Sequence, residues 1–492
     1  MRLVAVIFAI VSVTCFAEAA LAGAVLENKL RAHVNILASD AFEGRGPGTD
    51  GERKTTDYIS ESWRRAKLKP SGNAGGWLAP VPLVERSPAT SKFTFYQNGH
   101  RLKFADDDII LIGREEVFTA QAVPVVFAGY GTDADADAVK GKIAFMLAGA
   151  PNDVTGTQSA DRRAAMLVAA GAQGVILIAD GNAGSWAATR RRFMAKNTVL
   201  QSGDCAAALL GAVSAEFAVA IVTAANQDWD GLRKAAAKPE FSPVPLGVIA
   251  DFNVTTNIRR YISNNVIGKI AGQKKNSGAV VFMAHWDHLG ICRPDDEIDR
   301  ICNGAIDNAS GIAVITEVAS ALAKKRFDRD IYFVATTAEE TGLLGAYSFA
   351  ANPPLPLDQI VAAMNVDMIA IAPAGANVAI IGRGKTNLDT VIDSVAKKLR
   401  LKVEPSEQAN SFLKRQDGWA LTQQNVPAVM INSSFSDLAF LEKYLGNDYH
   451  NPSDELTSAT DFAGAAQDTV LHIALGKYFA SVRAFAGNKT GS

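Results

Sequence analysis

The sequence has few features that would point to nucleic acid, membranes or thiol chemistry. Its 492 residues carry 49 Lys and Arg against 51 Asp and Glu, a formal net charge of -2. This balance gives no reason to expect nucleic acid or an anionic membrane as a partner. No run after residue 22 is long and apolar enough to cross a membrane. No internal repeat or low-complexity segment occurs, and at this length we expect more than one compact domain.

Cysteine is also scarce. The chain has four cysteines, and Cys15 lies in the apolar N-terminal segment. The other three, Cys205, Cys292 and Cys302, have no Cys-x-x-Cys spacing, which argues against a metal site built from thiolates. Cys292 and Cys302 flank a charged loop, and an oxidising compartment would permit a disulfide between them.

Residues 1–22 have the pattern of a secretory signal peptide. Arg2 precedes an apolar run from Leu3 to Ala17, and small residues follow up to Ala22. A membrane anchor is the alternative, but the run is shorter than the roughly 20 residues that a spanning helix needs. We therefore expect a secreted or periplasmic protein that has no stable membrane insertion after signal cleavage.

Patterning divides the remaining chain at about residues 105 and 249. An amphipathic helix is predicted at 50–66, and 80–104 contains short alternating runs typical of strands. Residues 105–249 form a β-rich segment with a helix at 160–170 and strands at 123–127, 142–147, 174–178 and 218–222. In 250–492, apolar runs at 278–284, 331–336, 360–366, 378–381 and 426–431 alternate with helical segments. This alternation predicts an α/β domain with a mostly parallel sheet sandwiched by helices.

Acidic and imidazole side chains follow three of these predicted strands. In open α/β sheets, ligands bind beyond the carboxyl ends of the strands, so we expect these side chains to converge. Two more candidates come from a helix start and from a loop before the last helix. The set is His285, Asp287, Asp307, Glu339, Glu340, Asp367 and His450.

Each candidate also has an ordinary structural explanation. A single histidine at a strand end, such as His285, is usually structural. Glu339 and Glu340 could favour the N-terminal dipole of a helix, and Asp367 could cap one. Asp287 is best placed to orient the His285 ring rather than to bind metal. The joint placement of the set favours a metal site.

Five strings give the chain a recognisable resemblance. It resembles the dizinc exopeptidases of metallopeptidase family 28, which include aminopeptidase Y and glutamate carboxypeptidases. The matching strings are AHWDHLG, NGAIDNASG, TTAEETGLLGA, NVDMI and YHNPSDEL. The strings VVFAGYGT, VKGKIAFMLAG and AAGAQGVILI resemble the protease-associated domain inserted in many members, which we expect at 105–249 between parts of the peptidase domain at 23–104 and 250–492. No HExxH motif occurs, so the chain is not a thermolysin-type enzyme.

The resemblance implies a site with two Zn²⁺ ions. His285 and Asp367 would hold one ion, Glu340 and His450 the other, and Asp307 would bridge them. A hydroxide between the ions would attack the scissile carbonyl, with Glu339 as the general base. Three ligand carboxylates and one hydroxide balance the charge of two zinc ions, as a partly dry site requires.

The resemblance also implies supporting roles. Tyr449 would help to polarise the reacting carbonyl, and Asp287 would assist from behind His285. His288 would lie in the shell that supports the ligands. The Asp307–Asn308 peptide bond would be cis.

Aminopeptidase action on peptides with a free N-terminus is the leading expectation. A glutamate-carboxypeptidase-like enzyme needs a cationic pocket, for which Arg415 is a candidate, although Gln416 and Gly418 depart from the string that relatives have there. A glutaminyl cyclase is a further alternative, but such relatives usually lack the inserted module. A metal-free, receptor-like binding protein is disfavoured because every expected ligand is present.

Overall fold

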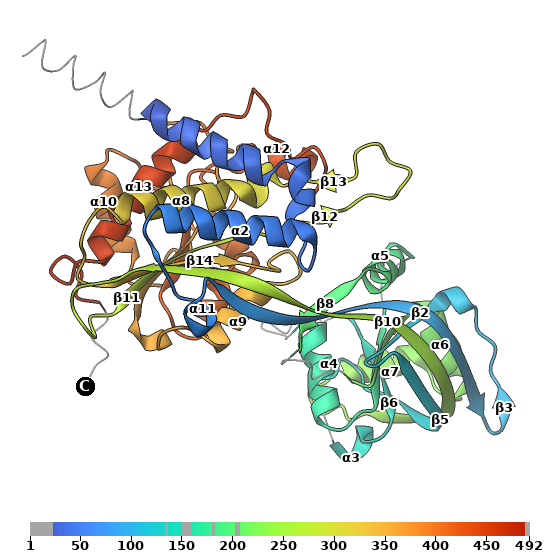
Figure 1. Cartoon of the computed structure of the whole chain (residues 1–492). Helices are drawn as coiled ribbons and strands as arrows, with labels where there is room; N and C mark the ends of the chain where they lie inside the picture. The colour runs from blue at the N-terminus through green and yellow to red at the C-terminus, as the bar shows by residue number, and fades with distance from the viewer. Residues whose placement is uncertain (1–22, 133–135, 150–158, 180–182, 202–206, 488–492) are drawn as a thin grey trace, which may run out of the picture. The chain divides into compact units, whose positions relative to one another are not determined.

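The chain divides into two compact units in the computed structural model (Figure 1), Met1–Val81 with Ile262–Ser492, and Pro82–Tyr261. The structure describes residues 23–132, 136–149, 159–179, 183–201 and 207–487. The signal peptide predicted for residues 1–22 and Cys205 lie outside these ranges. No helix among the described residues is long and apolar enough to span a membrane.

The first unit is built on a mixed sheet in which the central strands are parallel. The strand order is β16–β17–β15–β11–β14–β10, and only the two outer strands run antiparallel to their neighbours. The prediction of a mostly parallel sheet is confirmed. The strands are β10 (Val244–Ile270), β11 (Ala279–His285), β14 (Asp330–Thr336), β15 (Ile360–Asn365), β16 (Ala379–Ile381) and β17 (Ala428–Asn432), with the short β1 (Lys69–Pro70) beside β10.

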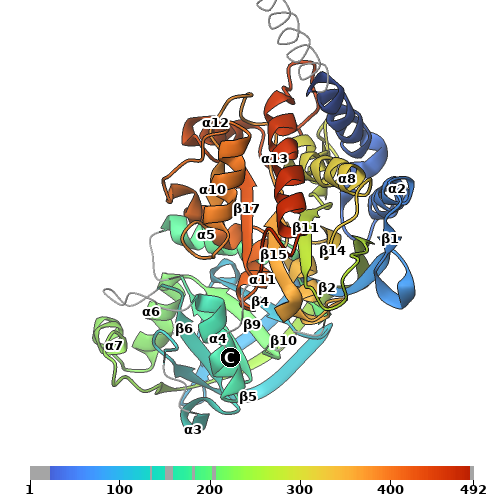
Figure 2. The same ribbon diagram turned by 90° about the vertical axis from the view of Figure 1, so that its left-hand side faces the viewer.

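Helices cover both faces of this sheet, because its central strands are apolar on both sides. In β11, Val280 and Phe282 belong to one buried core, whereas Val281 and Met283 belong to the other. The first core is covered by a helix at 23–37 and by α2 (Asp50–Arg65), α8 (Ser310–Leu322), α10 (Asp389–Lys398) and α13 (Ala463–Phe479). The second is covered by α9 (Leu344–Ala351) and α11 (Gly418–Thr422). Helices α8 and α13 lie side by side over the first face (Figure 2).

The second unit contains mixed-sheet strands with helices on both faces. Its strands β5, β6, β7 and β9 are parallel, and β4 pairs antiparallel with β9. The N-terminal part of β10 pairs antiparallel with β5. The elements are β2 (Leu78–Gln97), β3 (His100–Arg101), β4 (Ile109–Gly113), β5 (Val117–Phe127), β6 (Ile143–Leu147), β7 (Gly174–Ile178), β8 (Asn197–Leu200), β9 (Leu209–Val213), α3 (Ala136–Val139), α4 (Ala160–Ala169), α5 (Ala183–Met194), α6 (Ala215–Ala224) and α7 (Trp229–Ala236).

One sequence prediction for this part of the chain is wrong. Residues 218–222 are not a strand but lie in α6, because buried Phe217, Ala218, Ile221 and Val222 follow helical spacing. Ser214 caps that helix by accepting a hydrogen bond from the Phe217 amide at 3.1 Å. The strand structure expected within 80–104 is present, as one long strand, β2, followed by the short β3.

Candidate metal centre and active site

The candidate site lies at the carboxyl ends of three neighbouring parallel strands of the first unit. His285 is the last residue of β11, and it is in register with Thr336 at the end of β14. Glu339 and Glu340 follow Thr336 within four residues, and Asp367 follows the end of β15 by two. Since β15, β11 and β14 are adjacent, the sheet itself brings these side chains together.

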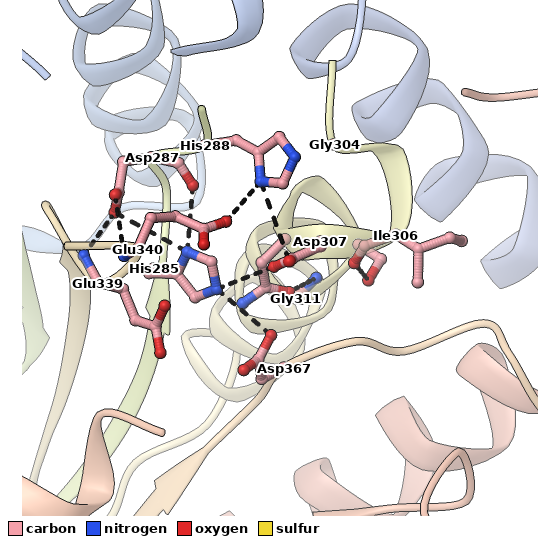
Figure 3. Close-up of polar contacts among 12 residues, drawn as sticks. His285, Asp287, His288, Gly304, Ile306, Asp307, Gly311, Glu339, Glu340 and Asp367 are labelled. Carbon is pink, nitrogen blue, oxygen red and sulfur yellow. Dashed lines mark hydrogen bonds and ion pairs between the residues drawn. The ribbon is translucent and has the colours of Figure 1, made fainter. Parts of the chain in front are cut away.

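The His285 ring directs one nitrogen to the backbone and the other to two carboxylates. Its Nδ1 donates to the carbonyl oxygen of Asp287 at 3.1 Å, because a carbonyl can only accept. Its Nε2 then faces Asp307 Oδ1 at 3.2 Å and Asp367 Oδ1 at 3.3 Å (Figure 3). A nitrogen lone pair opposite two carboxylate oxygens is repulsive unless a proton or a cation lies between them.

A second group of side chains surrounds Glu340. His288 Nδ1 is 2.6 Å from Glu340 Oε1, and His450 Nε2 is 2.9 Å from Glu340 Oε2. His450 Nε2 also lies 3.4 Å from Asp307 Oδ2. Asp307 therefore contacts His285 with one oxygen and His450 with the other, which is the arrangement that a bridging carboxylate needs.

The fit of these residues to metal rests on donor type and on unpaired atoms. Two sets of side chains have ligand atoms within 4.8 Å of one another, namely His285, Glu339 and Asp367, and His285, Asp307 and Glu340. Among the described residues, the buried atoms Asp367 Oδ1 and His450 Nε2 have contacts but no hydrogen-bond partner. Imidazole nitrogens and carboxylate oxygens are zinc ligands, so the residues present fit that metal.

Charge supports the same conclusion. Burial raises the pKa of Glu339 well above its usual value and also raises that of Asp367. Burial opposes ionisation of Asp307 too, but the close contacts of its carboxylate with the imidazoles of His285 and His450 outweigh it and lower the pKa of Asp307. Burial favours neutral His450, yet Asp307 and Glu340 raise its pKa to about 10. The cluster has an excess of negative charge that favours any bound cation.

Asp287 holds the segment that carries the two glutamates. Its Oδ1 accepts the Glu339 amide at 3.1 Å and its Oδ2 accepts the Glu340 amide at 3.4 Å. Burial raises the pKa of Asp287 to about 7. Its carboxylate is 3.8 Å from His285 Nδ1 and does not reach the candidate ligand atoms of that ring. Asp287 thus orients backbone and ring from behind the site.

His288 is fully buried against Glu340, as expected for a supporting residue. Its Nε2 has no hydrogen-bond partner among the described residues. Gly304, at φ +57, leaves room for the ring, since a Cβ atom there would lie 2.6 Å from His288 ring atoms. Figure 3 shows Asp307 between the side chains of His285 and His288.

Two residues that position Asp307 were not recognised from the sequence as site residues. The Asp454 carboxylate accepts the amides of Ile306 at 3.0 Å and Asp307 at 3.1 Å, and the Tyr444 hydroxyl at 2.9 Å. Fully buried Arg45, at the end of η1 (Asp40–Arg45), donates to the carbonyl oxygens of Leu37, Trp286, Asn303 and Gly304. Asp454 belongs to the matched string YHNPSDEL, but a string does not give a contact. The Asp307–Asn308 bond is cis, as the resemblance implied.

Tyr449 and a small cavity complete the site. The Tyr449 ring stacks on His450 with 3.7 Å between centroids. A cavity of about 20 Å³ opens beside it, with room for about one water molecule. Its lining is Asp307, Glu339, Asp367, Met368, Phe412, Arg415, Met430, Phe435 and Tyr449.

Cys292 and Cys302 form a disulfide, which settles the open choice between a disulfide and a metal site at these residues. The bond joins β12 (Gly290–Ile291) to β13 (Ile301–Cys302) across a ten-residue separation. The Cys302 sulfur lies 3.8 Å from the His450 carbonyl oxygen, so the disulfide is adjacent to the site.

Comparison with known proteins gives a family match for part of the chain. Residues 265–474 match the model of Peptidase family M28. A vacuolar membrane protease of Candida glabrata is 30% identical over 105 residues, 21% of this chain and 10% of that protein. A probable zinc metalloprotease of Leptosphaeria maculans is 31% identical over 108 residues, 22% of this chain and 24% of that protein. The chain thus spans between about a tenth and a quarter of the length of these relatives.

The fold has a solved counterpart. An aminopeptidase from Aneurinibacillus sp. strain AM-1 superposes with a TM-score of 0.53 at 17% identity, covering 92% of this chain and 93% of that one. At this identity the likeness shows the fold alone. Residues 265–474, the part of the chain that matches the model of Peptidase family M28, carry every candidate ligand from His285 to His450.

Proposed function

We propose that this protein is a dizinc aminopeptidase that hydrolyses the N-terminal peptide bond of peptides. The observation that carries the proposal is the His285 ring, whose free nitrogen faces Asp307 and Asp367 at 3.2 and 3.3 Å. The similarity to a probable zinc metalloprotease and to the fold of an aminopeptidase supports it.

His285 and Asp367 would hold one zinc ion, and Glu340 and His450 the other, with Asp307 shared. The ions, when bound, supply Lewis acidity that lowers the pKa of water and polarises a carbonyl group. All other steps depend on side chains of the chain. A metal-free binding role has no support from the site, because each expected ligand is present and near its partner.

Glu339 is the proposed general base. It lines the cavity beside Asp307 and Asp367, so it reaches the space where a peptide bond would lie. Burial raises its pKa, which strengthens it as a proton acceptor. Glu339 would take a proton from the attacking water and pass it to the leaving amine. Asp287 fixes its backbone amide during both transfers.

Tyr449 is the proposed electrophilic helper. Its ring is stacked on His450 and lines the same cavity, so its hydroxyl can approach the oxygen of a bound carbonyl. The hydroxyl would donate a hydrogen bond to the oxygen on which negative charge develops.

Secretion or a periplasmic location, and a protease-associated domain within the second unit, belong to the proposal as well. The Cys292–Cys302 disulfide supports an oxidising compartment. The helix-flanked mixed sheet of Pro82–Tyr261 is a compact unit, as an inserted domain should be.

Substitutions at two neighbouring residues distinguish the general base from a zinc ligand. Glu339→Gln should lower kcat by about 1000-fold, in the range of lost general-base catalysis, while zinc content stays at two per chain. Glu340→Gln, one residue on, should lose zinc and activity together. Zinc content by elemental analysis and hydrolysis of amino-acid arylamides measure both effects. Loss of zinc from the Glu339 variant would contradict its assignment as the base.

A further inference from the structure

Arg415 is the one cationic side chain among the residues that line the active-site cavity. The other charged residues there are Asp307, Glu339 and Asp367. Arg415 is exposed and forms no ion pair within 4.0 Å with any carboxylate of the described residues. Its guanidinium is therefore available to a carboxylate that is not part of this chain.

The Arg415 side chain is oriented by two aromatic residues. Its guanidinium carbon lies 5.5 Å from the centroid of the Phe412 ring, and its Nη2 is 3.4 Å from the Tyr449 hydroxyl. Phe412 in turn packs edge-on against Phe435 at 5.1 Å. Packing the flat face of a guanidinium against a ring leaves the donors on its edge free for a planar carboxylate.

The backbone next to Arg415 is also fixed. Arg415 ends η7 (Gln408–Arg415), and the next two residues are buried. The Gln416 side chain accepts the Gly418 amide at 2.8 Å, and Asp417 pairs with the Thr336 hydroxyl at the end of β14. These contacts hold the backbone next to Arg415 at the end of the sheet that carries Glu339 and Glu340.

The reach from Arg415 to the reacting groups is short. Tyr449 touches Arg415 with its hydroxyl and stacks on His450, a candidate zinc ligand, at 3.7 Å between centroids. Arg415 lines the same cavity of about 20 Å³ as Asp307 and Asp367, so a carboxylate at Arg415 would belong to a residue next to the scissile bond. Arg415 would also repel an α-ammonium, which the carboxylates deeper in the cavity attract.

We propose that Arg415 determines specificity by binding a substrate carboxylate next to the scissile bond, so that the preferred substrates are short peptides carrying one. This inference rests on the proposed peptidase function. The carboxylate has two possible sources, the free C-terminus of a dipeptide or the side chain of Asp or Glu. Both present the same group to the guanidinium.

Matched acid and amide substrates test the proposal on the full-length zinc enzyme. Leucyl-glycine against leucyl-glycinamide probes a free C-terminus, and leucyl-glutamic acid amide against leucyl-glutamine amide probes a side chain. Wild type should have a kcat/KM at least about tenfold higher for the acid of one pair. Arg415→Met should bring that acid-to-amide ratio near one, and Arg415→Lys should restore part of it. The pair that responds identifies the source.

Lys414→Met is the matched control. Lys414 is the neighbouring exposed cation, and its ammonium lies over the Trp419 ring at 5.7 Å, outside the cavity lining. This variant should keep the wild-type ratio. The wild-type preference should also weaken with rising ionic strength, because salt screens an exposed charge pair, and in Arg415→Met it should not.

The outcomes separate this inference from the proposed function. Equal rates on acid and amide in wild type, or an unchanged ratio in Arg415→Met, would overturn the role of Arg415 and leave the peptidase intact. No zinc-dependent hydrolysis of any of the four peptides would overturn both. Hydrolysis of N-blocked acids, with the same Arg415 dependence, would keep Arg415 and replace the aminopeptidase with a carboxypeptidase.

Discussion

The two units have sheets of the same kind but different side chains at the strand ends. In the first unit, β11, β14 and β15 lead into His285, Glu339 and Asp367. In the second, β5 and β6 lead into Ala128 and Ala148, and β9 leads into the helix cap Ser214. A parallel sheet offers a place for a site at its carboxyl edge, but the residues just beyond each strand decide whether chemistry occurs there.

A buried arginine closes the carboxyl edge in each unit. Arg163 in α4 donates to the carbonyl oxygens of Tyr130, Leu147, Ala148 and Gly149, which follow or end β5 and β6. Arg45 does the same for the loops around Asp307. Such an arginine satisfies carbonyl groups that no strand or helix can pair. Only Arg45 does so beside groups that could react.

The units also differ in buried titratable groups. Among the described residues of the second unit, no buried side chain is Asp, Glu or His. The first unit buries many, including Asp287, Asp307, Asp367, Asp468 and His472. The first unit should therefore carry most of the pH dependence of stability.

Replacing the two buried arginines should have the largest effect on stability, and it tests whether the two units differ in function. Arg45→Met and Arg163→Met should each lower the free energy of unfolding by about 3–5 kcal/mol, because each substitution leaves several buried carbonyl groups without a donor. Only Arg45→Met should also lower kcat, because Asn303 and Gly304 lead into Asp307. Hydrogen exchange should rise in β11 and β14 for the first variant and in β6 and β7 for the second. If Arg163→Met lowered kcat under conditions where all of the variant is folded, Arg163 would also affect the active site, and the proposed difference between the two arginines would be wrong.

Asp287→Asn tests whether activity needs the backbone of Glu339 and Glu340 to be held in place at the carboxyl edge of the first unit's sheet. The Glu339 and Glu340 amides each bond a different oxygen of Asp287, and in Asn one of those oxygens is replaced by an NH2 group that cannot accept. We expect zinc affinity or kcat to fall about 10–100-fold, as for other residues that orient metal ligands. Asp328→Asn, which removes charge just before the opposite end of β14, is the control and should change neither. Wild-type zinc affinity and kcat in the Asp287 variant would exclude this positioning role.

His472→Leu tests the pH dependence assigned to the first unit. Burial lowers the pKa of His472 to about 4, and the hydrogen bond to the Asp468 carbonyl opposes this only in part. The unfolded chain binds this proton near pH 6.5, so His472 destabilises the fold as pH falls from 6.5 towards 4. At pH 5, about 1.5 pH units below the unfolded pKa, His472 should lower the free energy of unfolding by about 2 kcal/mol, at 1.36 kcal/mol per pH unit.

Urea denaturation at pH 8 and pH 5 measures this effect. The His472 variant should lose less stability between the two pH values than wild type. The matched substitution at exposed His100 in the second unit, His100→Leu, should leave the difference in unfolding free energy between pH 8 and pH 5 as in wild type. An equal loss in wild type and the His472 variant would mean that the buried ring does not titrate as described.

The sequence predicted the parallel strands well because their apolar runs are continuous and bounded by helices. It failed at 218–222, where a short apolar run fits a strand and a helix equally, and only packing around Phe217 distinguishes them. His285, Glu339 and Asp367 could be predicted as site residues because they end or follow strands directly. Arg45 and Asp454 were missed as site residues because their contacts join segments more than 140 residues apart.

The sequence by itself determined which chemical groups this protein can use: imidazoles and carboxylates at strand ends, in a fixed order along the chain. Residue type and local periodicity are written in the sequence, so these inferences needed no coordinates. Only the tertiary structure decided that the Asp307 oxygens divide between His285 and His450, that Asp287 holds two amides, and that Arg415 is the cation beside the cavity. Those facts depend on distances between distant segments, which packing fixes and local sequence does not encode.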